Sequence, residues 1–190
     1  MIRIGVVGAI GSGKSYVSKS FGFPLFNADL EVAKLYKQDK TIFIKLKKVL
    51  PEYFNSFPVK KKEVADAILG NNSNLRKIIK IIHTSIKKKL QNFLKINKTK
   101  KVVILDIPLL LENKINKKKD ILIFVQSKQS IINKKLKERK GYNKKLFNKF
   151  KNIQLSLNHK KKKSHFIINN DFTKKTVCLL YTSDAADDSL

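Results

Sequence analysis

The segment Gly8-Ala9-Ile10-Gly11-Ser12-Gly13-Lys14-Ser15 constrains this chain more than any other feature. It fits the pattern G-x-x-x-x-G-K-[ST] and directly follows an apolar run over residues 2–7. Glycines allow the backbone to turn tightly and to approach a phosphate without an intervening Cβ. Backbone N–H groups then surround the anionic oxygens, helped by the N-terminus of the following helix. The segment therefore predicts a loop that binds the phosphates of a nucleoside triphosphate.

The polar side chains of this loop have specific expected tasks. The Lys14 ammonium is expected near the β- and γ-phosphates, and the Ser15 hydroxyl can ligate Mg²⁺. The residues expected to bind the nucleotide are Gly8, Gly11, Ser12, Gly13, Lys14, Ser15 and Tyr16. GTPases, AAA machines and small-molecule kinases all carry such a loop. Because the chain has 190 residues, it leaves no room for a large mechanical domain, and a small kinase fits best.

Short apolar runs alternate with helical patterns along the chain. Strands are predicted over residues 2–7, 24–26, 101–106, 120–125 and 166–168. Helical patterns cover residues 14–21, 30–36, 41–94, 130–140 and 144–163. The clearest helix has apolar residues at spacings of three and four between Leu75 and Phe93. This alternation predicts an α/β fold, with a parallel sheet covered by helices on both faces.

Composition favours one compact domain in the cytoplasm. The chain is 42% hydrophobic, which is enough for a substantial core. No stretch approaches the roughly 18–20 apolar residues of a membrane span. The glycine loop comes too early for a signal peptide to precede it. Cys178 is the only cysteine, so an internal disulfide is impossible.

The net charge of +28 raises the question of a nucleic-acid partner. Arg3, Arg76 and Arg139 are the only arginines, whereas proteins that read bases or grip phosphates usually favour arginine. Lysine, asparagine and isoleucine are all abundant, and all three have A/T-rich codons, so genome bias explains the charge. The excess charge still attracts acidic ligands such as nucleotides. We therefore expect no nucleic-acid partner, and a nucleic-acid-binding ATPase stays an alternative.

Three residues outside the loop are candidates for phosphoryl-transfer chemistry. Asp106 ends a hydrophobic strand, where it can hold Mg²⁺ directly or through water, or form a turn ahead of Pro108. Asp29 follows the second predicted strand and can accept a proton from an attacking hydroxyl, or cap the next helix. Arg139 lies in a lysine-rich helix, where it can clamp a transferring phosphate or form part of a solvated face.

Taken together, these segments resemble the dephospho-coenzyme A kinase family of P-loop kinases. The resemblance runs from Met1 to about Val177. Its most specific mark is Asp106-Ile107-Pro108-Leu109-Leu110-Leu111-Glu112, close to the family's Asp-Ile-Pro-Leu-Leu-Phe-Glu segment. Further similar segments are the phosphate loop, Asn27-Ala28-Asp29, Ile82-His83, Lys135 with Arg139, Gln154, and Ile167-Ile168-Asn169-Asn170.

The resemblance implies transfer of the ATP γ-phosphate to the ribose 3′-hydroxyl of dephospho-CoA, the last step of coenzyme A synthesis. It implies ATP and Mg²⁺ as cofactors, and ATP and dephospho-CoA as small-molecule partners. The catalytic residues would be Lys14, Asp29 and Arg139, and the metal ligands would be Ser15 and Asp106. Departures from the family pattern are Asn27 for Asp, Tyr16 for Thr, Thr84 for Pro and Lys135 for Arg. Among small P-loop kinases, the alternative is a nucleoside monophosphate kinase. The sequence does not determine the oligomeric state.

The resemblance also implies a division of one P-loop kinase domain over residues 1–177. The nucleotide core would comprise residues 1–29, 100–134 and 164–177. A helical acceptor-binding region would span residues 30–95, and a helical lid residues 135–163. Residues 178–190 differ in composition, since they contain no lysine and three aspartates, which indicates a non-native or disordered tail.

Overall fold

A computed structural model describes residues 1–139, 141–172 and 178–181 of the chain. The chain divides into two compact units. We call the first the sheet unit; it comprises Met1–Asn27, Asn97–Tyr142 and Ile153–Leu190. We call the second the helical unit; it comprises Ala28–Ile96 and Asn143–Asn152. Of the predicted segments, Lys140 in the lid, residues 173–177 of the nucleotide core and residues 182–190 of the tail lie outside the described residues.

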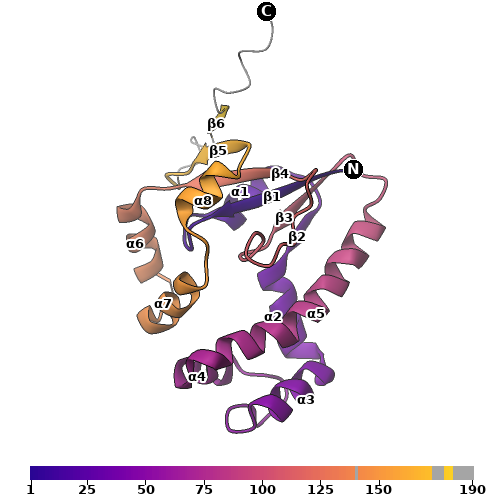
Figure 1. Ribbon diagram of the computed structural model, residues 1–190, viewed down its shortest axis with the longest axis vertical. Coiled ribbons are helices and arrows are strands. Elements are labelled where there is room, and N and C mark those ends of the chain that lie inside the picture. Colours follow the sequence, from indigo (N-terminus) through magenta and orange to yellow (C-terminus); the bar gives the residue numbers. More distant parts are fainter. Residues whose placement is uncertain (140, 173–177, 182–190) are drawn as a thin grey trace, which may run out of the picture. The chain divides into compact units, whose positions relative to one another are not determined.

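The sheet unit is built on one sheet that has six strands within the described residues, in the order β2-β3-β1-β4-β5-β6 (Figure 1). The strands are β1 (Ile2–Gly8), β2 (Leu25–Asn27), β3 (Val102–Asp106), β4 (Ile121–Gln126), β5 (Phe166–Asn169) and β6 (Cys178–Tyr181). The first five pair in parallel, and β6 pairs antiparallel to β5. The α/β fold with a parallel sheet is therefore confirmed. Since β1 lies between β3 and β4, the loop after β1 follows the sheet's central strand.

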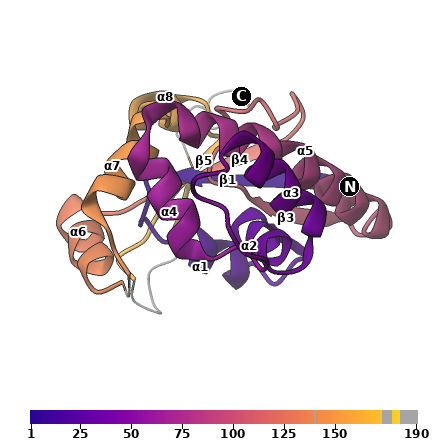
Figure 2. The same cartoon turned by 90° about the horizontal axis from the view of Figure 1, so that it is seen from below.

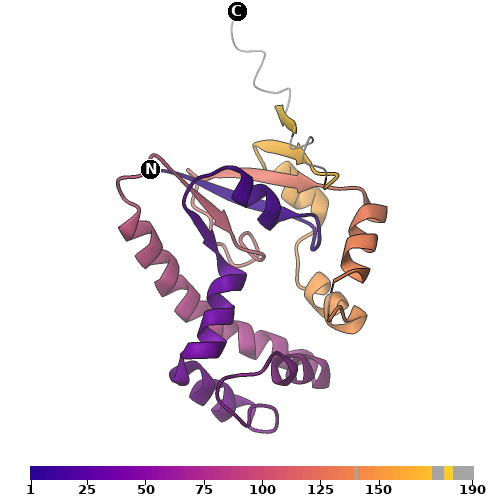
Figure 3. The same ribbon diagram turned by 180° about the vertical axis from the view of Figure 1, so that it is seen from behind.

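The sheet unit carries the helices α1 (Lys14–Ser20), α6 (Gln129–Lys137) and α8 (Leu157–Lys162). In Figure 1 α8 lies in front of the sheet, and in the reverse view of Figure 3 α1 lies in front. These helices therefore cover opposite faces, as the sequence predicts.

The main core cluster joins α1 to the strands and consists of Val6, Val17, Ile104, Ile123, Val125 and Ile168. Arg3 forms a buried ion pair with Asp120 at 2.9 Å, so this rare arginine is structural.

The helical unit contains α2 (Ala28–Gln38), α3 (Lys40–Val49), α4 (Lys61–Gly70), α5 (Asn72–Ile96) and α7 (Lys144–Asn152). The stripe predicted on the long helix is confirmed, since five of its residues are buried on α5: Leu75, Ile78, Ile82, Ile86 and Leu90. Figure 2 shows α7 beside α4. Lys149 of α7 donates to Asn72 Oδ1 at 2.8 Å, which connects α7 to the start of α5. No helix among the described residues meets the length and apolarity that a membrane crossing needs.

The helical pattern predicted over residues 144–163 is divided into two helices. Its first half, α7, belongs to the helical unit, and its second half, α8, belongs to the sheet unit. Ser156 provides the physical reason, because its hydroxyl accepts a hydrogen bond from His159 N at 3.2 Å and caps a new helix. The Ser156 backbone has φ −56° and ψ 146°, which is outside the helical range, so one helix cannot continue through this position.

Asp39 caps α3, and we expect its replacement by alanine to lower the free energy of unfolding by about 1 kcal/mol. Its carboxylate accepts hydrogen bonds from Thr41 N at 2.9 Å and Ile42 N at 3.2 Å, and it also contacts the Thr41 hydroxyl. The Thr41 side chain and these N–H groups lower the pKa of Asp39, although partial burial acts in the opposite direction. The stabilisation is therefore fully present above the usual pKa of an aspartate and is lost as pH falls through the lowered value.

The contribution of this cap can be measured by urea unfolding of wild type and Asp39→Ala, at pH 7 and at a series of acidic pH values. The difference between the two proteins should shrink as the pH falls. A difference that stays constant down to the most acidic pH at which both proteins fold would contradict the proposed contribution of the charged cap.

Candidate functional site

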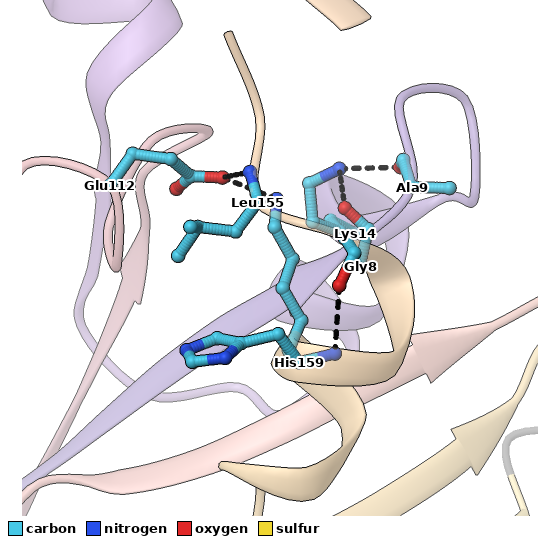
Figure 4. Close-up of polar contacts among 8 residues, drawn as sticks. Gly8, Ala9, Lys14, Glu112, Leu155 and His159 are labelled. Carbon is cyan, nitrogen blue, oxygen red and sulfur yellow. Dashed lines mark hydrogen bonds and ion pairs between the residues drawn. The ribbon is translucent and has the colours of Figure 1, made fainter. Parts of the chain in front are cut away.

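The predicted phosphate loop connects the central strand β1 to α1. Gly11 and Gly13 have φ values of 84° and 86°, a region that disfavours residues with a Cβ. The Lys14 ammonium lies over the loop backbone, where it donates to the Ala9 carbonyl at 2.7 Å and approaches the Gly8 carbonyl at 3.4 Å (Figure 4). The Lys14 ammonium therefore lies beside the backbone of the loop, and the glycines allow that backbone to curve.

Helix α6 packs against the tip of the loop at Gly11. A Cβ added to Gly11 would lie 3.0 Å from Leu136 Cγ and 3.1 Å from Ile132 Cγ2. Both side chains are buried on the apolar face of α6. Since the predicted lid begins at residue 135, the last turn of α6 belongs to it and supports the loop through Leu136, and Arg139 lies two residues beyond the helix.

The Ser12 carbonyl is held by two side chains that the sequence analysis does not assign to the site. Ser127 Oγ donates to it at 3.0 Å, and Asn170 Nδ2 donates to it at 2.9 Å. Ser12 itself is fully buried, and its hydroxyl has no hydrogen-bond partner within the part of the chain that the structure describes. The signal that could have found Asn170 is its place in the segment 167–170 that ends the predicted last strand.

Asp106 lies at the end of β3, in the strand next to β1. The register pairs Gly5 with Leu105 and Asn27 with Asp106. Asn27 Nδ2 donates to Asp106 Oδ2 at 2.6 Å, and Asp106 is only 3% exposed. Where the resemblance implies an aspartate, this chain has Asn27, a neutral hydrogen-bond donor to the carboxylate.

The remaining predicted site residues lie partly in the sheet unit and partly in the helical unit. Ser15 and Tyr16 are exposed in the first turn of α1, and Arg139 is exposed just beyond α6. These residues share the sheet unit with Lys14 and Asp106. Asp29 is exposed in the first turn of α2 and belongs to the helical unit. Because α2 begins at Ala28, Asp29 lies inside the helix and not before it.

Glu112, which ends the segment most specific to the resemblance, forms a buried ion pair. Its Oε1 lies 2.7 Å from Lys160 Nζ of α8 and accepts a hydrogen bond from Leu155 N at 3.0 Å (Figure 4). The two charged side chains are only 9% and 2% exposed. Glu112 therefore ties the loop after β3 to α8 and to the chain that enters it.

We expect Glu112→Gln to lower the free energy of unfolding by about 3 kcal/mol, because removing one partner of a buried pair leaves the other charge uncompensated. Urea unfolding of Glu112→Gln, Lys160→Met and the double variant measures this. The double variant should lose less than the sum of the single losses, since no unpaired ammonium or carboxylate remains. Strictly additive losses would show that the two charges do not stabilise each other.

Comparison with known proteins places these features in a family. The family model described as dephospho-CoA kinase matches residues 2–175. The dephospho-CoA kinase of Wolbachia pipientis wMel is 31% identical over 179 residues, covering 92% of this chain and 91% of the relative. The enzyme of the same name from Fusobacterium nucleatum is 34% identical over 179 residues, covering 88% and 89%.

Two solved structures share the fold. A Thermus thermophilus protein superposes with a TM-score of 0.71 at 22% identity and covers 89% of this chain and 88% of its own. The dephospho-CoA kinase from Campylobacter jejuni gives a TM-score of 0.57 at 19% identity, with coverages of 90% and 89%. At these identities the likeness concerns the fold alone.

Proposed function

The chain belongs to the dephospho-CoA kinase family of ATP-dependent phosphotransferases, and we propose that it phosphorylates the ribose 3′-hydroxyl of dephospho-CoA at the Gly8–Ser15 loop. The observation that carries the assignment of the site is the loop itself. Its glycine backbone is curved, and the Lys14 ammonium lies within 2.7 Å of a loop carbonyl. A cation at this place stabilises negative charge on the β- and γ-phosphates.

We assign Mg²⁺ to Ser15 and Asp106. Both supply oxygen atoms, which Mg²⁺ prefers, and Mg²⁺ typically takes one or two protein ligands while phosphate and water provide the rest. Asn27 donates one hydrogen bond to Oδ2 of Asp106, which leaves this carboxylate with further lone pairs that could serve the metal or its water. Within the described residues no group of three or more acidic, histidine or cysteine side chains forms a denser metal site. When bound, the ion neutralises charge on the transferring phosphate.

We assign acceptor activation to Asp29 and charge stabilisation to Lys14 and Arg139. The oxygen of the acceptor hydroxyl forms the new bond to the γ-phosphorus, its proton passes to the Asp29 carboxylate, and the bond to the β–γ bridging oxygen breaks to release ADP. Arg139 is exposed beyond α6, as a residue that approaches a bound nucleotide must be. The helical region over residues 30–95 would bind the acceptor, and residues 135–163 would act as a lid.

The test is an acceptor panel. The protein is incubated with Mg-ATP and, separately, dephospho-CoA, AMP, CMP and adenosine, and products are identified by mass. Phosphorus NMR then locates the new phosphate. We expect coenzyme A from dephospho-CoA, with the phosphate on the 3′-oxygen, and no turnover of CMP. Lys14→Ala, prepared in parallel, excludes a contaminating kinase.

Each alternative predicts its own result, the first in this panel and the second in ATPase and binding assays with RNA or DNA. Turnover of AMP or CMP without any product from dephospho-CoA would identify a nucleoside monophosphate kinase. ATP hydrolysis stimulated by RNA or DNA, with binding that weakens steeply as salt rises, would identify a nucleic-acid-binding ATPase.

A further inference from the structure

Asn170 lies where three strands of the sheet unit end near the phosphate loop. Its backbone N–H donates to Gln126 O at 2.8 Å, which continues the pairing of β5 with β4. Its side chain donates to the carbonyl of Ser12, which belongs to the loop after β1. Asn170 is 2% exposed, so its amide is a buried polar group whose hydrogen bonds are costly to lose.

The orientation of the Asn170 amide follows from its second contact. Phe172 N–H donates to Asn170 Oδ1 at 3.0 Å. A backbone N–H can only donate, so the atom facing it must be the amide oxygen. The amide nitrogen is therefore directed to Ser12 O, at 2.9 Å, as a donor.

The contact with Ser12 determines the direction of a neighbouring N–H group. The Ser12 carbonyl and the Gly13 N–H share one planar trans peptide, so they point in opposite directions. With the carbonyl held by Asn170 and Ser127, the Gly13 N–H must point away from both. Within the described residues this N–H has no hydrogen-bond acceptor. It is one of the donors that a loop of this pattern directs at phosphate oxygens.

Gly13 has no side chain, and this allows the Asn170 amide to lie close to its backbone. A Cβ on Gly13 would lie 2.1 Å from Asn170 Nδ2 and 3.0 Å from the Phe172 ring. The amide therefore packs directly on the Gly13 backbone, and the peptide cannot rotate without breaking both hydrogen bonds to Ser12 O.

We propose that Asn170, assisted by Ser127, is a positioning residue for nucleotide binding: it holds the Ser12–Gly13 peptide so that the Gly13 N–H faces the phosphates. This inference rests on the proposed function only in requiring that the loop binds nucleotide. It does not depend on which acceptor is phosphorylated.

The test measures Mg-ADP affinity by calorimetry for Asn170→Ala, Ser127→Ala, the double variant and Asn169→Ala. Asn169 is the matched control, because it is the same residue type one position earlier with an exposed side chain. We expect Asn170→Ala to bind about tenfold or more weakly, since a misdirected N–H loses a hydrogen bond to a charged group. Ser127→Ala should lose less, and the double variant more than either. Asn169→Ala should match wild type.

Steady-state kinetics separate positioning from a general structural role. For Asn170→Ala the KM for ATP should rise about tenfold or more, while the KM for the acceptor stays near that of wild type. Folding of each variant is verified by circular dichroism. If Asn170→Ala does not fold, Asn170→Ser, which retains a short donor, replaces it and should show weaker binding than wild type. A folded Asn170 variant with wild-type ADP affinity would overturn the inference, whereas ADP binding without coenzyme A production would overturn only the proposed function.

Discussion

Lys14→Ala is expected to lower kcat/KM for ATP by about 10³-fold or more, because one preorganised cation at the transferring phosphate is removed. The Lys14 ammonium is held over the loop by the Ala9 and Gly8 carbonyls and is thus already near the place where charge develops. Initial rates of coenzyme A formation at varied ATP measure the effect. Mg-ADP affinity should also fall, since the same ammonium contacts the bound phosphates.

Lys19→Ala is the matched control for this prediction. Lys19 is exposed in the last turn of the same helix, so its removal changes the net charge equally without touching the loop. Lys19→Ala should retain activity within about twofold of wild type. Equal losses for the two variants would mean that the overall positive charge, and not the position of Lys14, supports activity.

Asp29→Asn is expected to lower kcat by about 10²- to 10⁴-fold, the range typical for loss of a general base. The amide keeps the size of the side chain but cannot accept the proton of the acceptor hydroxyl. Mg-ADP affinity should change by about twofold at most, because Asp29 is assigned to the acceptor and not to the nucleotide. Single-turnover measurements beside calorimetric ADP binding separate the two quantities.

Asp66→Asn serves as the control for Asp29→Asn. Asp66 is exposed on α4, in the same helical unit and within the region proposed to bind the acceptor, but no part in proton transfer is assigned to it. It should behave as wild type in both measurements. If Asp29→Asn lost nucleotide affinity and rate in equal proportion, the assigned role in proton transfer would be wrong.

The parallel sheet and the long helix could be predicted from the sequence because their patterns are local. The parallel strands are short apolar runs, and α5 carries apolar residues at spacings of three and four from Leu75 to Phe93. The division of residues 144–163 between two units was not predicted. Both halves are basic and helical in pattern, and only their tertiary contacts, such as Lys149 with Asn72 and Lys160 with Glu112, distinguish them.

The strand β6 was also not predicted from its sequence. Residues 178–181 belong to the segment set apart by composition, and their pairing depends on the open edge of the neighbouring strand β5. A strand that joins an existing edge acquires its hydrogen bonds from its neighbour. Its own residues therefore carry little signal.

For the phosphate loop, the sequence by itself determined the spacing of glycines, lysine and serine, because a backbone that curves around phosphate needs those residues in immediate succession. Only the tertiary structure decided what holds that loop in place. Asn170 lies 158 residues from Ser12 along the chain, and Ser127 lies 115 away, yet both donate to the same carbonyl. A hydrogen bond between residues this far apart leaves no periodic pattern in the sequence. It exists because parallel pairing brings the ends of β1, β4 and β5 to one edge of the sheet.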